Sequence, residues 1–207
     1  MIRVLIVEDQ RLMRETLESY IRRAEGYTVA GWLERASRTK DFCAVNPVDL
    51  VLMDVCTENE ESGFTATQEI KALHPETRVV IVTSMLDFTY LTRAREVGAE
   101  GFWYKDATEA ELMRVIDAVM HGETVYPDKP PKVTVGIASS YDFSEGELRV
   151  LRRLVEGDSY TEIAERLNIS PETVKTHVSH MLQKTGFKSK TQLVAQIIKK
   201  NIVVNGY

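Results

Sequence analysis

Residues 1–122 alternate short apolar runs with segments of helical periodicity, and few folds accommodate that alternation. Five runs are rich in Val and Ile and mostly lack the polar alternation of a half-exposed sheet: IRVLIV (2–7), YTVAGWL (27–33), DLVLM (49–53), RVVIVT (78–83) and GFWY (101–104). Such runs are typical of strands buried on both faces. Between them, apolar residues recur at helical spacing, as at Met13, Leu17 and Ile21. The pattern predicts an α/β domain with a doubly wound, five-stranded parallel sheet.

Residues 143–207 show no strand pattern and four marked helix starts. Three are capping boxes, Ser144 with Glu147, Ser159 with Glu162 and Ser189 with Gln192, and the fourth is Ser170 followed by a proline. We predict a small all-α domain with helices at 145–156, 160–167, 171–185 and 190–200. Between the two domains, residues 123–142 include three prolines within five residues and no clear period. This composition predicts a linker.

Charge is divided unevenly between the two parts. Residues 1–124 carry 14 basic and 22 acidic residues, whereas the remainder carries 12 and 9. A basic module joined to an acidic one suggests contact with a polyanion. No apolar run approaches the roughly 20 residues that cross a bilayer, and the N-terminus lacks the features of a signal peptide. With only two cysteines, we expect a cytoplasmic protein without a membrane partner.

Polar side chains gather where the predicted strands end. Glu8 and Asp9 follow the first strand, Asp54 the third, Thr83 and Ser84 the fourth, and Lys105 the fifth. The carboxyl ends of parallel strands meet at one edge of an open sheet, where α/β proteins bind their ligands. Three crowded carboxylates repel one another unless a cation lies among them, and oxygen ligands suit Mg²⁺. Asp54, at the end of the central strand, is the best nucleophile for a phosphoryl group.

This set of residues resembles the receiver domain of two-component response regulators. The resemblance implies strand order 2-1-3-4-5 and phosphorylation of Asp54 by a partner histidine kinase. It also implies that Glu8, Asp9, Asp54 and the backbone carbonyl of Cys56 hold Mg²⁺. Three further residues take family roles: Lys105 pairs with the phosphoryl oxygens, Thr83 follows the phosphate, and Phe102 moves with it as part of the switch.

The segment after Asp54 departs from the receiver pattern. Receivers have a Met-Pro pair there and a glycine eight residues beyond the acceptor, whereas DVCTENEESG has no proline and places Gly63 nine beyond. The loop is therefore one residue longer, and it is strongly acidic. Lys105 is followed by Asp106 instead of proline. The loop conformation and the lifetime of the phosphoryl group are the properties that this departure affects.

The predicted helices at 160–167 and 171–185 have the spacing of a helix-turn-helix, whose second helix enters the major groove of DNA. Its apolar positions, Val174, Val178, Met181 and Leu182, follow one helical face. The opposite face and its margin present polar and basic side chains: Thr173, Lys175, Thr176, His177, Ser179, Lys184 and Lys188. Donors and cations on an exposed helix face suit phosphates and purine edges.

The string FSEGELRVLRRLVEGDSYTEIAERLNISPETVKTHVSHMLQKTG resembles the LuxR-type DNA-binding domain, and with the receiver it resembles a NarL/FixJ-type response regulator. The resemblance implies that Lys175, Thr176 and Ser179 read bases. It implies that Thr173, His177, Lys184 and Lys188 contact the DNA backbone, and that the helix at 190–200 forms a dimer contact. Gly146 stands where the family has arginine.

The chain is therefore predicted to be a DNA-binding transcription regulator and not an enzyme. Phosphorylation at Asp54 is expected to promote a homodimer that binds an inverted repeat in double-stranded DNA. Two alternatives remain open. One is a DNA-binding regulator whose receiver works without phosphate. The other is a haloacid-dehalogenase-like, Mg²⁺-dependent phosphatase, a family that requires a second aspartate where this chain has Cys56.

Overall fold

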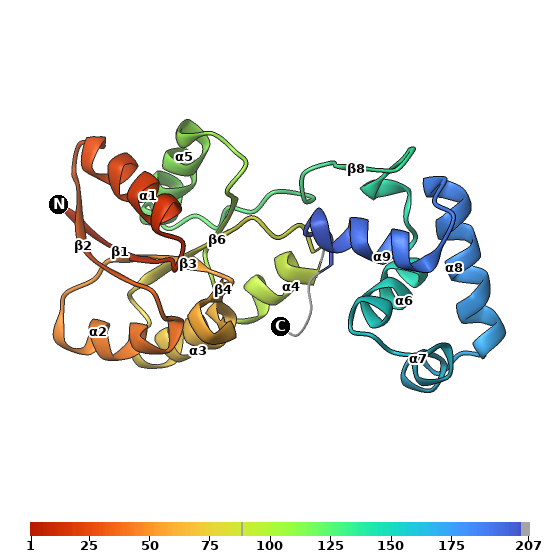
Figure 1. The fold of residues 1–207 in the computed structure, drawn as a ribbon. Helices are drawn as coiled ribbons and strands as arrows, with labels where there is room; N and C mark the ends of the chain where they lie inside the picture. Colours follow the sequence, from red (N-terminus) through yellow and green to blue (C-terminus); the bar gives the residue numbers. More distant parts are fainter. Residues whose placement is uncertain (88, 204–207) are drawn as a thin grey trace. The chain divides into compact units, whose positions relative to one another are not determined.

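A computed structural model describes residues 1–87 and 89–203 and divides them into two compact units (Figure 1). Unit 1 holds Met1–Ser84 and Thr89–Lys129, and unit 2 holds the described residues of 85–87 and 130–203.

Unit 1 is built around an all-parallel sheet with strand order β2-β1-β3-β6-β7, which confirms the predicted order. Its strands are β1 (Ile2–Val7), β2 (Tyr27–Leu33), β3 (Leu50–Asp54), β6 (Arg78–Thr83) and β7 (Gly101–Tyr104). Its helices are α1 (Arg11–Arg23), α2 (Thr39–Val45), α3 (Gly63–Leu73), α4 (Thr89–Glu96) and α5 (Glu109–Met120). Helices α1 and α5 cover one face of the sheet, and α2 and α3 lie on the other (Figure 1). This is the predicted doubly wound α/β architecture.

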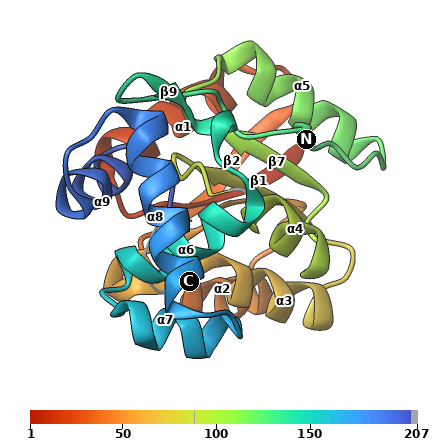
Figure 2. The ribbon, with the colours of Figure 1, turned by 90° about the vertical axis from the view of Figure 1, so that its right-hand side faces the viewer.

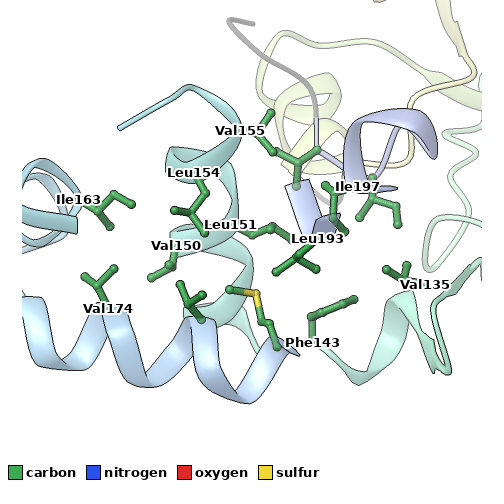
Figure 3. Close-up of a cluster of buried hydrophobic side chains, with 14 of the residues drawn as sticks. Val135, Phe143, Val150, Leu151, Leu154, Val155, Ile163, Val174, Leu193 and Ile197 are labelled. Atoms are coloured by element: carbon green, nitrogen blue, oxygen red, sulfur yellow. The ribbon is translucent and has the colours of Figure 1, made fainter. Parts of the chain in front are cut away.

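The described part of unit 2 is mainly helical, as predicted, and it contains one short hairpin that was not predicted. Its helices are α6 (Glu145–Val155), α7 (Tyr160–Leu167), α8 (Pro171–Thr185) and α9 (Lys190–Lys199). Helix α8 packs against α6, α7 and α9 (Figure 2). The apolar faces of these helices meet in one core, where Leu151 of α6 approaches Leu193 and Ile197 of α9 (Figure 3). Asp87 also belongs to this unit, and both of its carboxylate oxygens accept hydrogen bonds from Arg152, at 2.5 and 2.7 Å.

The predicted helix starts are confirmed by their caps. The side-chain oxygens of Ser144, Ser159 and Ser170 each accept a backbone N–H three residues on, and the first two boxes are reciprocated by a glutamate. Ser189 also caps its helix, but the Gln192 side chain accepts from the Lys188 N–H and so does not close the expected box. The ends of α6 and α9 fall one residue earlier than predicted.

The predicted linker, 123–142, contains more structure than its prolines suggest. Strands β8 (Thr134–Val135) and β9 (Ala138–Ser139) form a hairpin that packs in unit 2, with Val135 fully buried. Gly136 turns the hairpin at φ 64°, where an added Cβ would lie 2.0 Å from the Thr185 carbonyl oxygen. The Ile137 N–H donates to that same oxygen. Two-residue strands are too short to show a period, so sequence reasoning missed them.

Candidate functional site

The edge of the sheet brings together the polar residues predicted to meet there. Strand β3 is buried along its whole length and ends at Asp54 itself, one residue later than predicted. Glu8 and Asp9 follow β1, and Lys105 follows β7. The neighbouring strands run parallel and in register, so their carboxyl ends project to the same side.

The three carboxylates form one tight cluster. Glu8, Asp9 and Asp54 each offer an oxygen within 4.8 Å of the others. Glu8 is fully buried, and Asp54 is 5% exposed. The Lys105 ammonium bridges two of them, lying 2.6 Å from Glu8 Oε2 and 2.8 Å from Asp54 Oδ2. Three carboxylates beside one ammonium leave an excess of negative charge that suits a divalent cation.

Burial controls the protonation of this cluster. Removal from water raises the pKa of Asp54, an effect that Lys105 opposes and the charge of Glu8 reinforces. Burial alone would lower the pKa of Lys105, but the charges of Asp54 and Glu8 raise it, so the ammonium stays protonated. A fixed positive charge beside a buried carboxylate is the arrangement expected where a phosphoryl group is received.

The long acidic loop after Asp54 forms a small hairpin of β4 (Cys56–Thr57) and β5 (Glu61–Ser62). It ends at Gly63, whose N–H donates to the Val55 carbonyl and whose added Cβ would lie 1.9 Å from the Asp54 carbonyl oxygen. Glycine is thus required at this close approach, despite its shift by one position from the receiver pattern. Cys56, whose carbonyl was predicted to bind metal, begins β4.

Thr83 and Phe102, the predicted switch residues, are both buried. Thr83 ends β6, and its backbone carbonyl accepts the Lys105 N–H at 2.9 Å. Phe102 lies in β7 with its ring centroid 5.0 Å from that of Tyr104. The movement of these two residues as a switch stays a prediction.

Sequence reasoning missed Arg14 and Glu34. Arg14 stands three residues before Leu17 and seven before Ile21, which places it on the buried face of α1. The sequence did offer one signal for Arg14, namely a charged residue within the apolar stripe of a predicted helix. Its side chain reaches the Glu8 carbonyl oxygen and the Glu34 carboxylate.

Helix α8 presents the second candidate site. Val174, Val178 and Met181 are buried, as their spacing predicts, and Lys175, Thr176 and Ser179 are exposed on the other side. The short turn before α8 contains Asn168 in a left-handed conformation, followed by the Ser170 cap. Thr173 and His177 are partly buried, and Lys188 is exposed. The His177 ring lies against Gly146, where an added Cβ would be 3.1 Å from its Cε1 atom.

Lys184 makes a contact different from the predicted DNA contact. Its ammonium donates to both carboxylate oxygens of Glu147, at 2.9 and 2.7 Å, and to the Asp142 carbonyl oxygen at 2.8 Å. The Glu147 side chain is 3% exposed and holds this ammonium against α6. The Lys184 ammonium therefore neutralises the Glu147 carboxylate within unit 2, because a buried carboxylate requires a partner for its charge.

Replacing Glu147 with Gln is expected to lower the free energy of unfolding of unit 2 by about 2 kcal/mol at pH 7. Burial would raise the pKa of Glu147, but hydrogen bonds from Lys184 and the Ser144 N–H lower it overall. A carboxyl with a depressed folded-state pKa stabilises above its unfolded pKa, and this stability is lost as the pH falls through the folded value.

The difference between wild type and Glu147→Gln should therefore shrink below about pH 4.5. Urea unfolding of the full chain, followed by circular dichroism at neutral and acidic pH, measures it. Glu145→Gln, at an exposed position of the same helix, is the control. An equal loss at both pH values would contradict the ionic origin of the effect.

Among the described residues, no helix is both long enough and apolar enough to cross a membrane.

Two family models match the chain. The model of the response regulator receiver domain matches residues 4–117, and that of the bacterial regulatory proteins of the luxR family matches residues 142–197. The first match contains all of the acidic cluster and Lys105, and the second contains α8. Both candidate sites thus lie inside matched segments.

Similar proteins agree with these matches. The oxygen regulatory protein NreC of Staphylococcus aureus (strain JH9) is 33% identical over 171 residues, which cover 75% of this chain and 77% of that protein. A two-component response regulator of the LuxR family from Aurantimonas sp. SI85-9A1 is 27% identical, with a TM-score of 0.58 over 61% of this chain and 89% of its own.

A further solved structure is RcsB from Salmonella enterica serovar Typhimurium, bound to promoter rprA in the presence of the phosphomimetic BeF3⁻. It is 20% identical, with a TM-score of 0.62 over 95% of this chain and 98% of its own. At this identity the likeness concerns the fold.

Proposed function

Because the chain belongs to the NarL/FixJ-type response regulators of two-component systems, we propose that Asp54 accepts a phosphoryl group from a partner histidine kinase. These regulators are DNA-binding transcription regulators with a receiver and a LuxR-type helix-turn-helix domain. The observation that carries the proposal is the cluster of Glu8, Asp9 and Asp54 with Lys105 bridging two of its carboxylates. Phosphorylation then promotes dimerisation and sequence-specific DNA binding.

In the proposed reaction, a carboxylate oxygen of Asp54 attacks phosphorus, and the bond from phosphorus to the kinase histidine breaks as the new P–O bond forms. Lys105, held within 2.8 Å of Asp54, pairs with the phosphoryl oxygens. Glu8, Asp9, Asp54 and the Cys56 carbonyl would hold Mg²⁺, which when bound offsets negative charge on the transferring group. The Thr83 hydroxyl binds a phosphoryl oxygen afterwards and links the phosphate to the switch.

Incubating the full chain with a small phosphodonor, followed by intact-mass measurement, tests this proposal. We expect one added phosphoryl group in the presence of Mg²⁺ and none after chelation, because the carboxylates alone repel an incoming phosphate. Absence of the modification under both conditions would contradict it and favour a regulator whose receiver works through protein contacts alone. The phosphatase alternative lacks support, since a cysteine occupies the position of its second aspartate.

For DNA binding, we propose that α8 enters the major groove with Lys175, Thr176 and Ser179 at base edges. Their exposure on the face opposite the core supports this assignment. Thr173, His177 and Lys188 would contact the DNA backbone. Lys184, whose ammonium Glu147 also binds and whose side chain is 36% exposed, is proposed to contact the DNA backbone with them. The partner DNA is proposed to be an inverted repeat, read by a twofold dimer in the cytoplasm.

Replacing Lys175 with Ala is expected to weaken binding to the specific site by about 1 to 3 kcal/mol and to reduce sequence preference, since base contacts carry specificity. Lys188→Ala is the matched control: loss of a phosphate contact should weaken binding to all sequences alike and reduce the salt slope by about one unit. Titrations with specific and scrambled DNA at several salt concentrations measure both effects. An unchanged ratio of specific to nonspecific affinity in Lys175→Ala would show that the proposed register of α8 is wrong.

A further inference from the structure

Arg14 carries a charge into the interior of unit 1. Its side chain, on the face of α1 that Leu17 also occupies, is 11% exposed. One guanidinium nitrogen, Nη1, donates to the Glu8 carbonyl oxygen at 3.3 Å and to the Glu34 carboxylate at 3.0 Å. The guanidinium carbon lies 4.1 Å from the ring centroid of Trp32. The charge is therefore held from three directions.

A packing role alone does not account for this residue. Arginine keeps its proton in proteins, so its burial carries a desolvation cost that leucine at the same position would avoid. Glu34 offsets part of this cost, but its own side chain is 47% exposed and thus stays partly in water. What arginine supplies and leucine lacks is directed hydrogen bonding.

The backbone groups reached by this pair belong to two different loops of the acidic site. Arg14 binds the carbonyl of Glu8, and the Glu8 N–H donates to the Leu33 carbonyl at 2.8 Å, so the peptide groups on both sides of Glu8 are held. The second member of the pair, Glu34, reaches the other loop through its backbone carbonyl, which accepts the Glu58 backbone N–H at 3.2 Å. Glu58 lies two residues after Cys56, in the loop that follows the acceptor aspartate.

We propose that Arg14 and Glu34 form a clamp, the Arg14–Glu34 clamp, that positions the two Mg²⁺-binding loops of the receiver relative to each other. One loop is the Glu8–Asp9 turn, and the other carries the Cys56 carbonyl. The inference rests on the proposed function, because it concerns the same metal site. It adds two positioning residues, neither of which contacts the metal or the phosphoryl group.

The preference of Mg²⁺ for near-ideal octahedral geometry gives this clamp its effect. Ligands from separate loops must be held in place before the ion binds, or their ordering lowers the affinity. Groups that orient metal ligands without touching the metal typically change metal affinity by about 10- to 100-fold when mutated. We therefore expect Arg14→Met to weaken Mg²⁺ binding by about tenfold or more.

The experiment measures Mg²⁺ affinity directly by calorimetry on the full chain, without a phosphodonor. Glu34→Gln, at a partly exposed side chain, is a milder second variant that keeps the test valid if Arg14→Met does not fold. Arg14→Lys keeps the charge without the planar fork and should restore part of the affinity. The double variant should lose little more than Arg14→Met alone, because both residues act through one contact.

Trp32 provides a second readout, since the chain has two tryptophans and Trp103→Phe leaves Trp32 as the sole emitter. Mg²⁺ should change Trp32 emission only while Arg14 connects the ring to Glu8. The matched control is Arg11→Ala, which removes an exposed ion pair with Glu15 on the same helix and should leave affinity unchanged.

Equal Mg²⁺ affinity in wild type, Arg14→Met and Glu34→Gln would overturn the clamp and leave the proposed phosphorylation intact. Wild-type protein that binds no Mg²⁺ would overturn both. A loss confined to Arg14→Met and Glu34→Gln, with partial rescue in Arg14→Lys, supports the clamp.

Discussion

Replacing Asp54 with Asn is expected to abolish phosphorylation of this protein, leaving no added phosphoryl group in intact-mass measurement with phosphodonor and Mg²⁺. The side-chain amide has nearly the shape of the carboxylate, and its oxygen can still accept the Val55 N–H that binds Asp54 Oδ1 at 2.7 Å. The amide is a poor nucleophile and carries no charge for a metal. The fold should persist while the chemistry is lost.

Asp106→Asn is the matched control, because Asp106 is an exposed acid beside Lys105 at the same edge of the sheet. It should be phosphorylated as fully as wild type. Asp9→Ala should suppress phosphorylation strongly without removing the acceptor, since it takes one oxygen ligand from the cluster. Undiminished modification of Asp54→Asn would refute the assignment of the acceptor.

Phosphorylation is expected to raise affinity for an inverted repeat by about 100-fold, the largest effect that we predict for DNA binding. A single helix-turn-helix offers few base-reading side chains, whereas a dimer engages two half-sites and makes the second binding step intramolecular. The phosphate can act only by stabilising one receiver conformation over another. Sedimentation and DNA titration on the phosphorylated and unmodified protein measure the gain.

Thr83→Ala should separate phosphorylation from the gain in dimerisation and DNA affinity that follows it. Thr83 is buried at the end of β6, the strand that pairs with the one ending at Asp54, and its backbone carbonyl accepts the Lys105 N–H. We therefore propose that its hydroxyl follows the phosphate. The variant should accept the phosphoryl group yet gain little dimerisation or DNA affinity. Ser84→Ala, at the next and partly exposed residue, is the control. Equal self-association and affinity in phosphorylated and unmodified wild type would contradict the coupling model.

Most of the acidic site could be predicted from sequence because topology places it. Once the strands at 2–7, 49–53, 78–83 and 101–104 were assigned to a parallel sheet, their carboxyl ends had to meet. Glu8, Asp54 and Lys105 needed no further information to be brought together. The helix starts could also be predicted, because the Ser144 and Ser159 side chains accept hydrogen bonds from backbone N–H groups only three residues away.

The amino-acid sequence alone thus determined the helix starts and the residues at the edge of the sheet, because each depends on neighbours or on strand polarity. The strand order followed only from the resemblance to receiver domains. Tertiary structure decided which charges are used internally. A helical projection places Lys184 at the margin of the exposed face, yet its ammonium binds Glu147, 37 residues away. Arg14 of α1 likewise binds Glu34, which follows β2. Helical periodicity tells which face is buried, but the partner of a buried charge depends on packing between elements distant in sequence.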